Sequence, residues 1–281
     1  MPSQPSNDAL PLAGRKTEDL PGHWLLARLG KRVLRPGGRE LTERLLDDAD
    51  LAGADVLEIA PGLGKTAASI IEHTPRSYVG VESDSAAAGL TEGVVGDRGR
   101  VVPGDASATG LDDESVDVAI GEAMLTMQSD RAKAEIVAEA FRVLRPGGRY
   151  AIHELALHPD TLPDEAKAEI RKQLARSIKV NARPLTEQEW RKLFTDAGFE
   201  IKKVGFAKMA LLQPRRVLAD EGPLRTLRFV GNVLRDSDAR KRVLGMRATF
   251  TKYRDELAAI EVIAVKLSLI HISEPTRLGM I

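Results

Sequence analysis

The segment that most constrains this chain is an apolar run that ends in a carboxylate and then turns twice on glycine. Residues Ala54–Thr66 read ADVLEIAPGLGKT. The apolar, β-branched half predicts a strand up to about Ile59, and the residues after Gly64 predict a helix. Glycine lets backbone approach a ligand where a Cβ would clash, and the first N–H groups of the helix point into the same space. The segment therefore predicts a nucleotide-cofactor loop in an α/β fold.

Two phosphate-binding motifs fit this loop incompletely. Gly64-Lys65-Thr66 matches the end of a P-loop, but the glycine that begins that motif would fall at Ile59, which disfavours this alternative. A dinucleotide fingerprint G-x-G-x-x-G/A fits from Gly62 to Ala67, with an acid twenty positions after Gly62 at Glu82. A single match of this kind is weak evidence, so the loop alone leaves the cofactor open.

A third alternative is a cofactor that carries an ammonium group, which Glu58 at the end of the strand would suit. Two further predicted strands end in acids. Ser77–Glu82 places a carboxylate where its two oxygens can accept from both hydroxyls of a ribose. Arg100–Ala106 places Asp105 where it can accept from an adenine amine. Acids at successive strand ends favour a cofactor that contains both an ammonium group and a nucleoside.

The pattern continues along the chain. Val116–Glu122 predicts a fourth strand, and Asp130–Leu144 predicts a helix that Pro146-Gly147-Gly148 ends before a fifth strand, Arg149–Glu154. The octapeptide RVLRPGGR occurs at 142–149 and also at 32–39, and we interpret both copies as helix stops.

This ordered series of strand-end acids, with R-x-L-R-P-G-G before the fifth strand, resembles the class I S-adenosylmethionine-dependent methyltransferases, of the small-molecule, type 11-like kind. The resemblance covers about residues 50–208 and the last strand. It implies a Rossmann-like, doubly wound α/β fold with a mostly parallel seven-stranded sheet and helical N-terminal and insertion caps. One departure is that Ala60, followed by Pro61, stands where the family has its first loop glycine.

The resemblance also implies how S-adenosyl-L-methionine is held. The loop from Glu58 to Gly64 would hold the methionine part, Glu82 the ribose, and Asp105 with Ala106 the adenine. The full set of implied cofactor contacts is Glu58, Ala60, Pro61, Gly62, Leu63, Gly64, Glu82, Ser83, Asp105, Ala106 and Glu122.

Composition excludes several other classes of protein. The 281 residues are 43% hydrophobic, which suffices for a core, and Lys+Arg and Asp+Glu are both 41, so no global charge favours nucleic acid. Cysteine is absent, which excludes disulfides, thiolate metal sites and a cysteine nucleophile. No metal-binding spacing is present. We find no apolar run of membrane-spanning length and no signal peptide in Met1–Asp8, so we expect a cytoplasmic protein.

We expect three divisions of the chain: a helical N-terminal cap at 1–50, a methyltransferase domain at 51–266, and a tail at 267–281. The tail resembles the translated read-through of a sequencing adapter, and we interpret it as non-native. Within the cap, His23 and Trp24 belong either to a substrate lid or, the alternative we favour, to ordinary core.

A helical insertion at about 210–256 is strongly basic. Between Pro214 and Arg254 there are eleven Lys or Arg and four Asp or Glu, and a break around Asp236-Ser237-Asp238 predicts two helices. We favour a solvated basic face, with an anionic substrate or peripheral contact with a membrane surface as alternatives. Nucleic acid is disfavoured because few aromatic residues accompany the charges.

The acceptor is expected beyond the carboxyl ends of the strands, near Glu122 and His153-Glu154. We predict these three as candidate catalytic residues, with His153 either a general base or a histidine hydrogen-bonded beneath the cap. The expected activity is methyl transfer from S-adenosylmethionine to a small molecule whose identity, like the oligomeric state, the sequence leaves open. An NAD(P)-dependent oxidoreductase lacks support because no Tyr-x-x-x-Lys pair occurs. A non-catalytic scaffold that binds S-adenosylmethionine is the remaining alternative.

Overall fold

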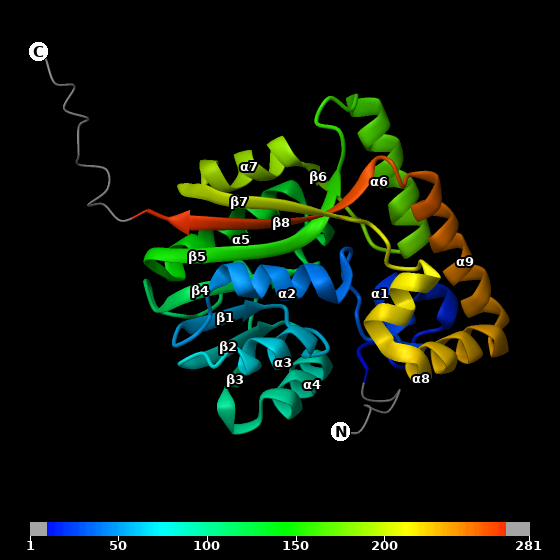
Figure 1. Ribbon diagram of the computed structural model, residues 1–281, viewed down its shortest axis with the longest axis horizontal. Coiled ribbons are helices and arrows are strands. Elements are labelled where there is room, and N and C mark those ends of the chain that lie inside the picture. The colour runs from blue at the N-terminus through cyan, green and yellow to red at the C-terminus, as the bar shows by residue number, and fades with distance from the viewer. Residues whose placement is uncertain (1–9, 268–281) are drawn as a thin grey trace, which may run out of the picture.

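The computed structural model describes residues 10–267, so the polar start of the chain and nearly all of the adapter-like tail lie outside the described residues. Seven strands of this part form a sheet in the order β3-β2-β1-β4-β5-β8-β7 (Figure 1). Strand β8 runs antiparallel to β5 and β7, whereas the pairs from β3 through β5 are parallel. A two-residue strand, β6 (Leu185–Thr186), pairs with the end of β5. The predicted mostly parallel, seven-stranded, doubly wound sheet is confirmed. The seven strands are β1 (Asp55–Ile59), β2 (Ser77–Glu82), β3 (Arg100–Pro103), β4 (Val116–Glu122), β5 (Leu144–Leu157), β7 (Phe199–Lys208) and β8 (Leu257–Lys266).

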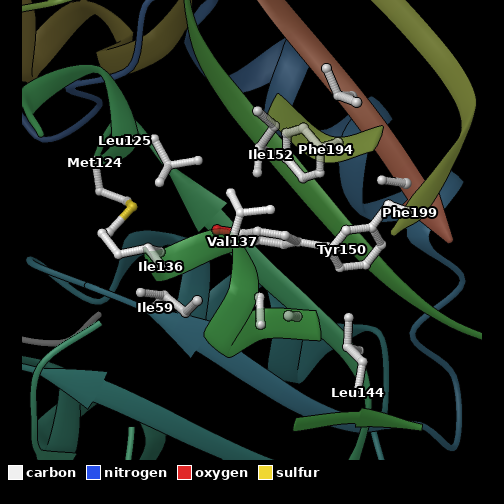
Figure 2. Close-up of a cluster of buried hydrophobic side chains, with 14 of the residues drawn as sticks. Ile59, Met124, Leu125, Ile136, Val137, Leu144, Tyr150, Ile152, Phe194 and Phe199 are labelled. Carbon is white, nitrogen blue, oxygen red and sulfur yellow. The ribbon is translucent and has the colours of Figure 1, made fainter. Parts of the chain in front are cut away.

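Helices cover both faces of the sheet because successive strand residues point to opposite sides and both sides are apolar. In β1, Val56 packs with one cluster of buried side chains and Leu57 with the other. The first cluster includes residues of α2 (Gly38–Ala49), α3 (Lys65–Glu72) and α4 (Ser85–Val95); the second includes residues of α5 (Asp130–Val143) and α7 (Glu187–Asp196). Figure 2 shows part of the second cluster, where the Tyr150 ring lies beside Val137 and 5.4 Å from that of Phe194.

Four further helices gather beyond one end of the sheet (Figure 1). They share a third hydrophobic cluster and the adjoining cluster under the end of β5, with Leu25, Phe229 and Met246 buried in the former. We call this group the cap; it consists of α1 (Gly22–Arg28), α6 (Asp164–Ile178), α8 (Pro214–Arg235) and α9 (Ser237–Lys252). The proposed N-terminal cap thus has two parts, since α1 joins these helices while α2 packs on the sheet.

Side-chain caps mark the starts of several helices. Thr186 and Glu189 form a capping box at the start of α7. The basic insertion is two helices, and Asp236 caps the second by accepting from the N–H groups of Asp238 and Ala239. A further break inside α8 occurs at Gly222, whose φ of +75° is outside the helical region.

Two sequence interpretations need correction. Strand β5 begins at Leu144 and runs to Leu157, longer than the predicted Arg149–Glu154, because the Pro-Gly-Gly sequence forms an irregularity inside the pairing with β4 and does not precede the strand. The octapeptide ends a helix only in its second copy. The first copy follows α1 after a gap and its last two residues begin α2.

Candidate active site

A cavity of about 640 Å³ lies between the carboxyl ends of the strands and the cap. Its wall on the sheet side contains most of the predicted site residues, and its wall on the cap side is largely apolar. Gly64 and His153 are the two predicted residues that do not line it. The predicted residues that do are Glu58, Ala60, Pro61, Gly62, Leu63, Glu82, Ser83, Asp105, Ala106, Glu122 and Glu154.

Every second residue of the glycine loop has a positive φ, and this sets the path of its backbone. The angles are +56° at Ala60, +59° at Gly62 and +68° at Gly64. A Cβ on Gly62 would meet only the carbonyl oxygen of Ala60, at 3.9 Å, so this position is open on the cavity side. A Cβ on Gly64 would instead lie 3.1 Å from Thr91 of α4. Gly62 therefore leaves room for a ligand, whereas Gly64 allows two helices to pack closely.

Glu82 organises the loop as well as facing the cavity. Its Oε2 accepts from the Gly62 N–H at 3.1 Å, and its Oε1 accepts from the Asp84 N–H at 3.0 Å. Asp105, at the next strand end, accepts from the backbone N–H and the hydroxyl of Ser107, and these bonds lower the pKa of its carboxyl. Both acids thus lie where the sequence predicts, already held in place by neighbouring backbone.

Glu58 is almost fully buried at the end of β1, and the Tyr78 hydroxyl donates to its Oε2 at 2.7 Å. Burial raises the pKa of Glu58 to about 8, because the Tyr78 bond only partly offsets the loss of solvation and Glu122 adds a like charge. Near neutral pH this carboxyl is therefore largely protonated, and a cation beside it would favour its ionised form.

Glu122, at the end of β4, is the centre of a charged network. Arg35 donates from Nε to Glu122 Oε2 at 2.8 Å, and the Thr42 hydroxyl donates to Oε1 at 2.6 Å. The hydroxyl of Thr66 also donates to this carboxylate. Burial opposes its charge, but Arg35, His153 and Thr42 together lower the pKa of Glu122 to about 2. The carboxylate is accordingly ionised and holds the segment before α2 against β4.

His153 is fully buried beneath this network. Its Nε2 accepts from the Gly37 N–H at 2.9 Å, which leaves Nδ1 as the donor to Glu122 at 2.9 Å. Both ring nitrogens are thus occupied, and the ring does not face the cavity. This geometry matches the alternative of a histidine hydrogen-bonded beneath the cap.

Glu154 is also fully buried, although it borders the cavity. Its oxygens accept from the backbone N–H groups of Met124, Leu125 and Thr126 and from the Thr126 hydroxyl, at 2.7–3.1 Å. Burial raises the pKa of Glu154, and these bonds counteract that rise. Through these hydrogen bonds, Glu154 holds the turn that follows β4.

The cap contributes residues that sequence reasoning assigned elsewhere. His23 and Trp24 both line the cavity, with ring centroids 4.8 Å apart, together with Met246 and Phe250 of α9. Burial lowers the pKa of His23 to about 4, so its ring is neutral at physiological pH. Among residues 10–267, no hydrogen bond to the His23 ring is present.

Three cations near the glycine loop were missed. Arg32, Arg35 and Lys65 line the cavity, and within the described chain Lys65 has no ion pair. Burial, and then the charges of Arg225 and Arg32, lower the pKa of Lys65. The only sequence signal for Arg32 and Arg35 was their place in the first octapeptide, which we interpreted as a helix stop.

Comparison with known proteins identifies the family. A family model for a methyltransferase domain matches residues 57–152, the segment that carries the loop and the strand-end acids. Residues 57–152 are therefore a methyltransferase domain, in agreement with the resemblance to the class I S-adenosylmethionine-dependent methyltransferases. A Haemophilus influenzae protein described as uncharacterized is 32% identical over 259 residues, which are 89% of this chain and 99% of that protein.

Solved structures share the fold of this chain. Phosphoethanolamine N-methyltransferase 2 of Haemonchus contortus, in complex with phosphomonomethylethanolamine and S-adenosylhomocysteine, superposes with a TM-score of 0.67 at 17% identity over 88% of this chain and 57% of that one. A (4+2) cyclase, SpnF, superposes with a TM-score of 0.63 at 16% identity over 81% and 80%. At such identities the likeness concerns the fold alone.

Between Leu10 and Leu267 no three His, Cys, Asp or Glu side chains gather in a way that could hold a metal ion. In the same part of the chain, no helix is both long and apolar enough to cross a membrane.

Proposed function

We propose that this methyltransferase transfers the methyl group of S-adenosylmethionine to a small molecule with an apolar body. The observation that supports this most directly is the continuity of one cavity from the strand-end acids to an apolar chamber in the cap. Cofactor and acceptor sites must adjoin for a group to pass between them, and water must be kept out.

The residues present fit this cofactor. Gly62 leaves space on the cavity side where a Cβ would stand, and Glu82 keeps free lone pairs for a ribose beside the two N–H groups it already accepts from. Glu58 can bind the ammonium group of the methionine part. Lys65, which lines the cavity beside Arg32, can bind its carboxylate. Asp105 and Ser83 line the remaining wall, where an adenosine would lie.

When bound, the cofactor supplies an electrophilic methyl group on a sulfonium, so the protein's task is mainly alignment and exclusion of water. Trp24, Met246 and Phe250 would hold the apolar body of the acceptor against the strand ends. An acceptor hydroxyl or carbon acid must also lose a proton. We propose that His23 accepts this proton, because it lines the cavity and its ring has no hydrogen-bond partner among the described residues.

We propose positioning roles for the three predicted catalytic residues. Glu122 and His153 hold the segment around Arg35 and Gly37 over the end of β4, and Glu154 fixes the turn at Met124–Thr126 that forms the cavity wall. Substitution of any one of these three residues would change the shape of the site by shifting the backbone segments that they hold.

Calorimetric titration with S-adenosylmethionine, S-adenosylhomocysteine and NAD tests the cofactor. We expect the two adenosyl compounds to bind and NAD to bind much more weakly; a preference for NAD would instead favour an oxidoreductase. Incubation of metabolite extracts with methyl-labelled cofactor then tests the reaction, since a labelled product identifies the acceptor. Binding without any labelled product from a broad set of extracts would favour the scaffold alternative, or a reaction other than methyl transfer.

A further inference from the structure

The outer side of α8, after its break at Gly222, exposes a row of large apolar side chains. Leu224 is 81% exposed, Leu227 70%, Val230 45% and Leu234 60%. Their spacings of three, three and four residues place them on one side of a helix. We call these four residues the α8 face. Leu218 and Leu244 are also exposed, so six of the nine exposed large hydrophobic residues found between Leu10 and Leu267 belong to α8 and α9.

These exposed side chains are not part of the hydrophobic cluster of the cap. The opposite side of α8 already buries Phe229 and Val217 in the cap's hydrophobic cluster. Solvent exposure of so many large apolar groups on one side is uncommon in a monomeric protein unless the surface binds something.

Basic residues border the α8 face. Arg228 and Arg235 are exposed on the same helix, and Arg240 and Lys241 follow at the start of α9. Over 214–254 basic residues exceed acidic ones by seven, although the whole chain is neutral. An apolar row beside arginines and lysines is the pattern of a helix that lies in the interface of a bilayer with anionic lipids.

We propose that the α8 face binds the surface of a membrane that contains anionic lipids. The leucines would enter the boundary between head groups and acyl chains, and the bordering cations would contact lipid phosphates. A second copy of the chain fits this surface less well, because two such faces would bring like charges together. This inference does not rest on the proposed methyl transfer. It does bring α9, which lines the cavity with Met246 and Phe250, close to a source of apolar molecules.

Sedimentation of the full chain with vesicles tests the proposal. Vesicles of phosphatidylcholine alone are compared with vesicles containing about one third phosphatidylglycerol, at low and high salt. We expect binding to the anionic vesicles, and a steep decline at high salt because exposed charge pairs are screened. Leu224→Gln combined with Leu227→Gln should weaken this binding at least about tenfold, since two leucines no longer enter the apolar layer.

Two further variants separate the contributions. Arg235→Gln with Lys241→Gln should weaken binding to anionic vesicles by about fivefold for each charge. Phe206→Gln, which alters an exposed apolar residue on β7 that is 41% exposed, is the matched control and should bind as the parent does. Equal melting temperatures would confirm that the leucine variant is folded, as the high exposure of its two sites leads us to expect.

Three outcomes would overturn the proposal. One is the absence of sedimentation with anionic vesicles at low salt, and another is undiminished binding by the leucine variant. The third is a concentration-dependent dimer, seen by light scattering, that the leucine variant abolishes while vesicles fail to bind. That result would assign the α8 face to self-association.

Discussion

Arg35, ahead of α2, and Glu122, at the end of β4, form a nearly buried ion pair with 2.8 Å between Nε and Oε2. The pair joins a segment of the N-terminal region to the middle of the sheet. Since Glu122 also receives bonds from Thr42 and His153, loss of Arg35 would leave a buried carboxylate with neutral partners only.

We therefore expect Arg35→Met to lower the free energy of unfolding by roughly 3 kcal/mol, the lower end of the range for breaking a buried pair. Adding Glu122→Gln should recover part of this loss, because the uncompensated charge is then gone. Denaturant unfolding measures both. Arg39→Met is the control: its pair with Glu43 is about 60% exposed on each side, so the change should stay below about 0.5 kcal/mol.

The same variant should change the response to acid. A carboxyl whose pKa is lowered to about 2 stabilises the fold at pH above its ordinary value of 4.5, and this contribution disappears as the pH falls toward 2. In Arg35→Met the pKa of Glu122 rises, so the loss of stability between these pH values should become smaller. Equal acid dependence in both proteins would contradict the assigned role of Arg35.

Glu82→Ala should weaken the affinity for S-adenosylhomocysteine by about 1.5–3 kcal/mol, the usual contribution of hydrogen bonds to a charged group. Calorimetry measures the affinity, and the melting temperature checks the loop, since Glu82 also accepts from Gly62. Glu72→Ala, at an exposed position in α3, is the control. Unchanged affinity in folded Glu82→Ala would show that another residue holds the ribose.

Cofactor binding at pH 7 should release up to one proton per molecule bound. Glu58, with a pKa of about 8, holds a proton that an adjacent ammonium group would displace. Titrations in buffers of different ionisation enthalpy would detect the release, and Glu58→Gln should abolish it. In the cofactor-free protein, the raised pKa means that stability falls as the pH rises from about 4.5 to about 8, and Glu58→Gln should remove that fall.

The half-buried His23 and the fully buried His153 should respond differently to substitution. If the labelled product comes from an acceptor that loses a proton, His23→Gln should reduce turnover by about 10²–10⁴-fold with little change in melting temperature. His153→Gln should instead cost about 1–3 kcal/mol of stability, because the Gly37 N–H and Glu122 lose their partner. His73→Gln, outside the cavity, is the control. Full turnover by His23→Gln would remove this residue from the mechanism.

Ala60→Gly should raise the free energy of unfolding by about 0.5–1 kcal/mol. Alanine at φ +56° bears a steric cost that glycine avoids, and the greater freedom of glycine in the unfolded chain offsets only part of the gain. Ala68→Gly in α3 is the matched contrast and should lower stability by about 0.5–1 kcal/mol. A destabilised Ala60→Gly protein would mean that the alanine methyl makes a contact that outweighs the strain.

The sheet could be predicted from sequence because each strand is short, apolar on both sides and followed by a helix with its own stop signal. β2 and β4 occur at the predicted residues. Strand-end position is a local property, so one chain is enough to predict Glu58, Glu82 and Asp105 as the acids that we propose for the cofactor site.

The acceptor side could not be predicted in the same way. Arg35 reaches Glu122 across 87 positions, and His153 meets Gly37 across 116, so their pairing depends on tertiary packing that has no periodic signature. The place of His23 was also hidden from sequence. Its apolar neighbours Leu25 and Leu26 are buried in the core, and only the fold shows that His23 lines the cavity.

The helices α8 and α9 leave the sheet after Lys208 and return just before Ala258, and these two residues are cross-strand partners. The excursion thus begins and ends at neighbouring points of one antiparallel pair, only about 5 Å apart. A change in the length of this segment therefore need not shift the register of β7 against β8. The constraint on the segment comes instead from its packing with α1 and α6, so the cap can change only as a unit while the sheet keeps its pairing.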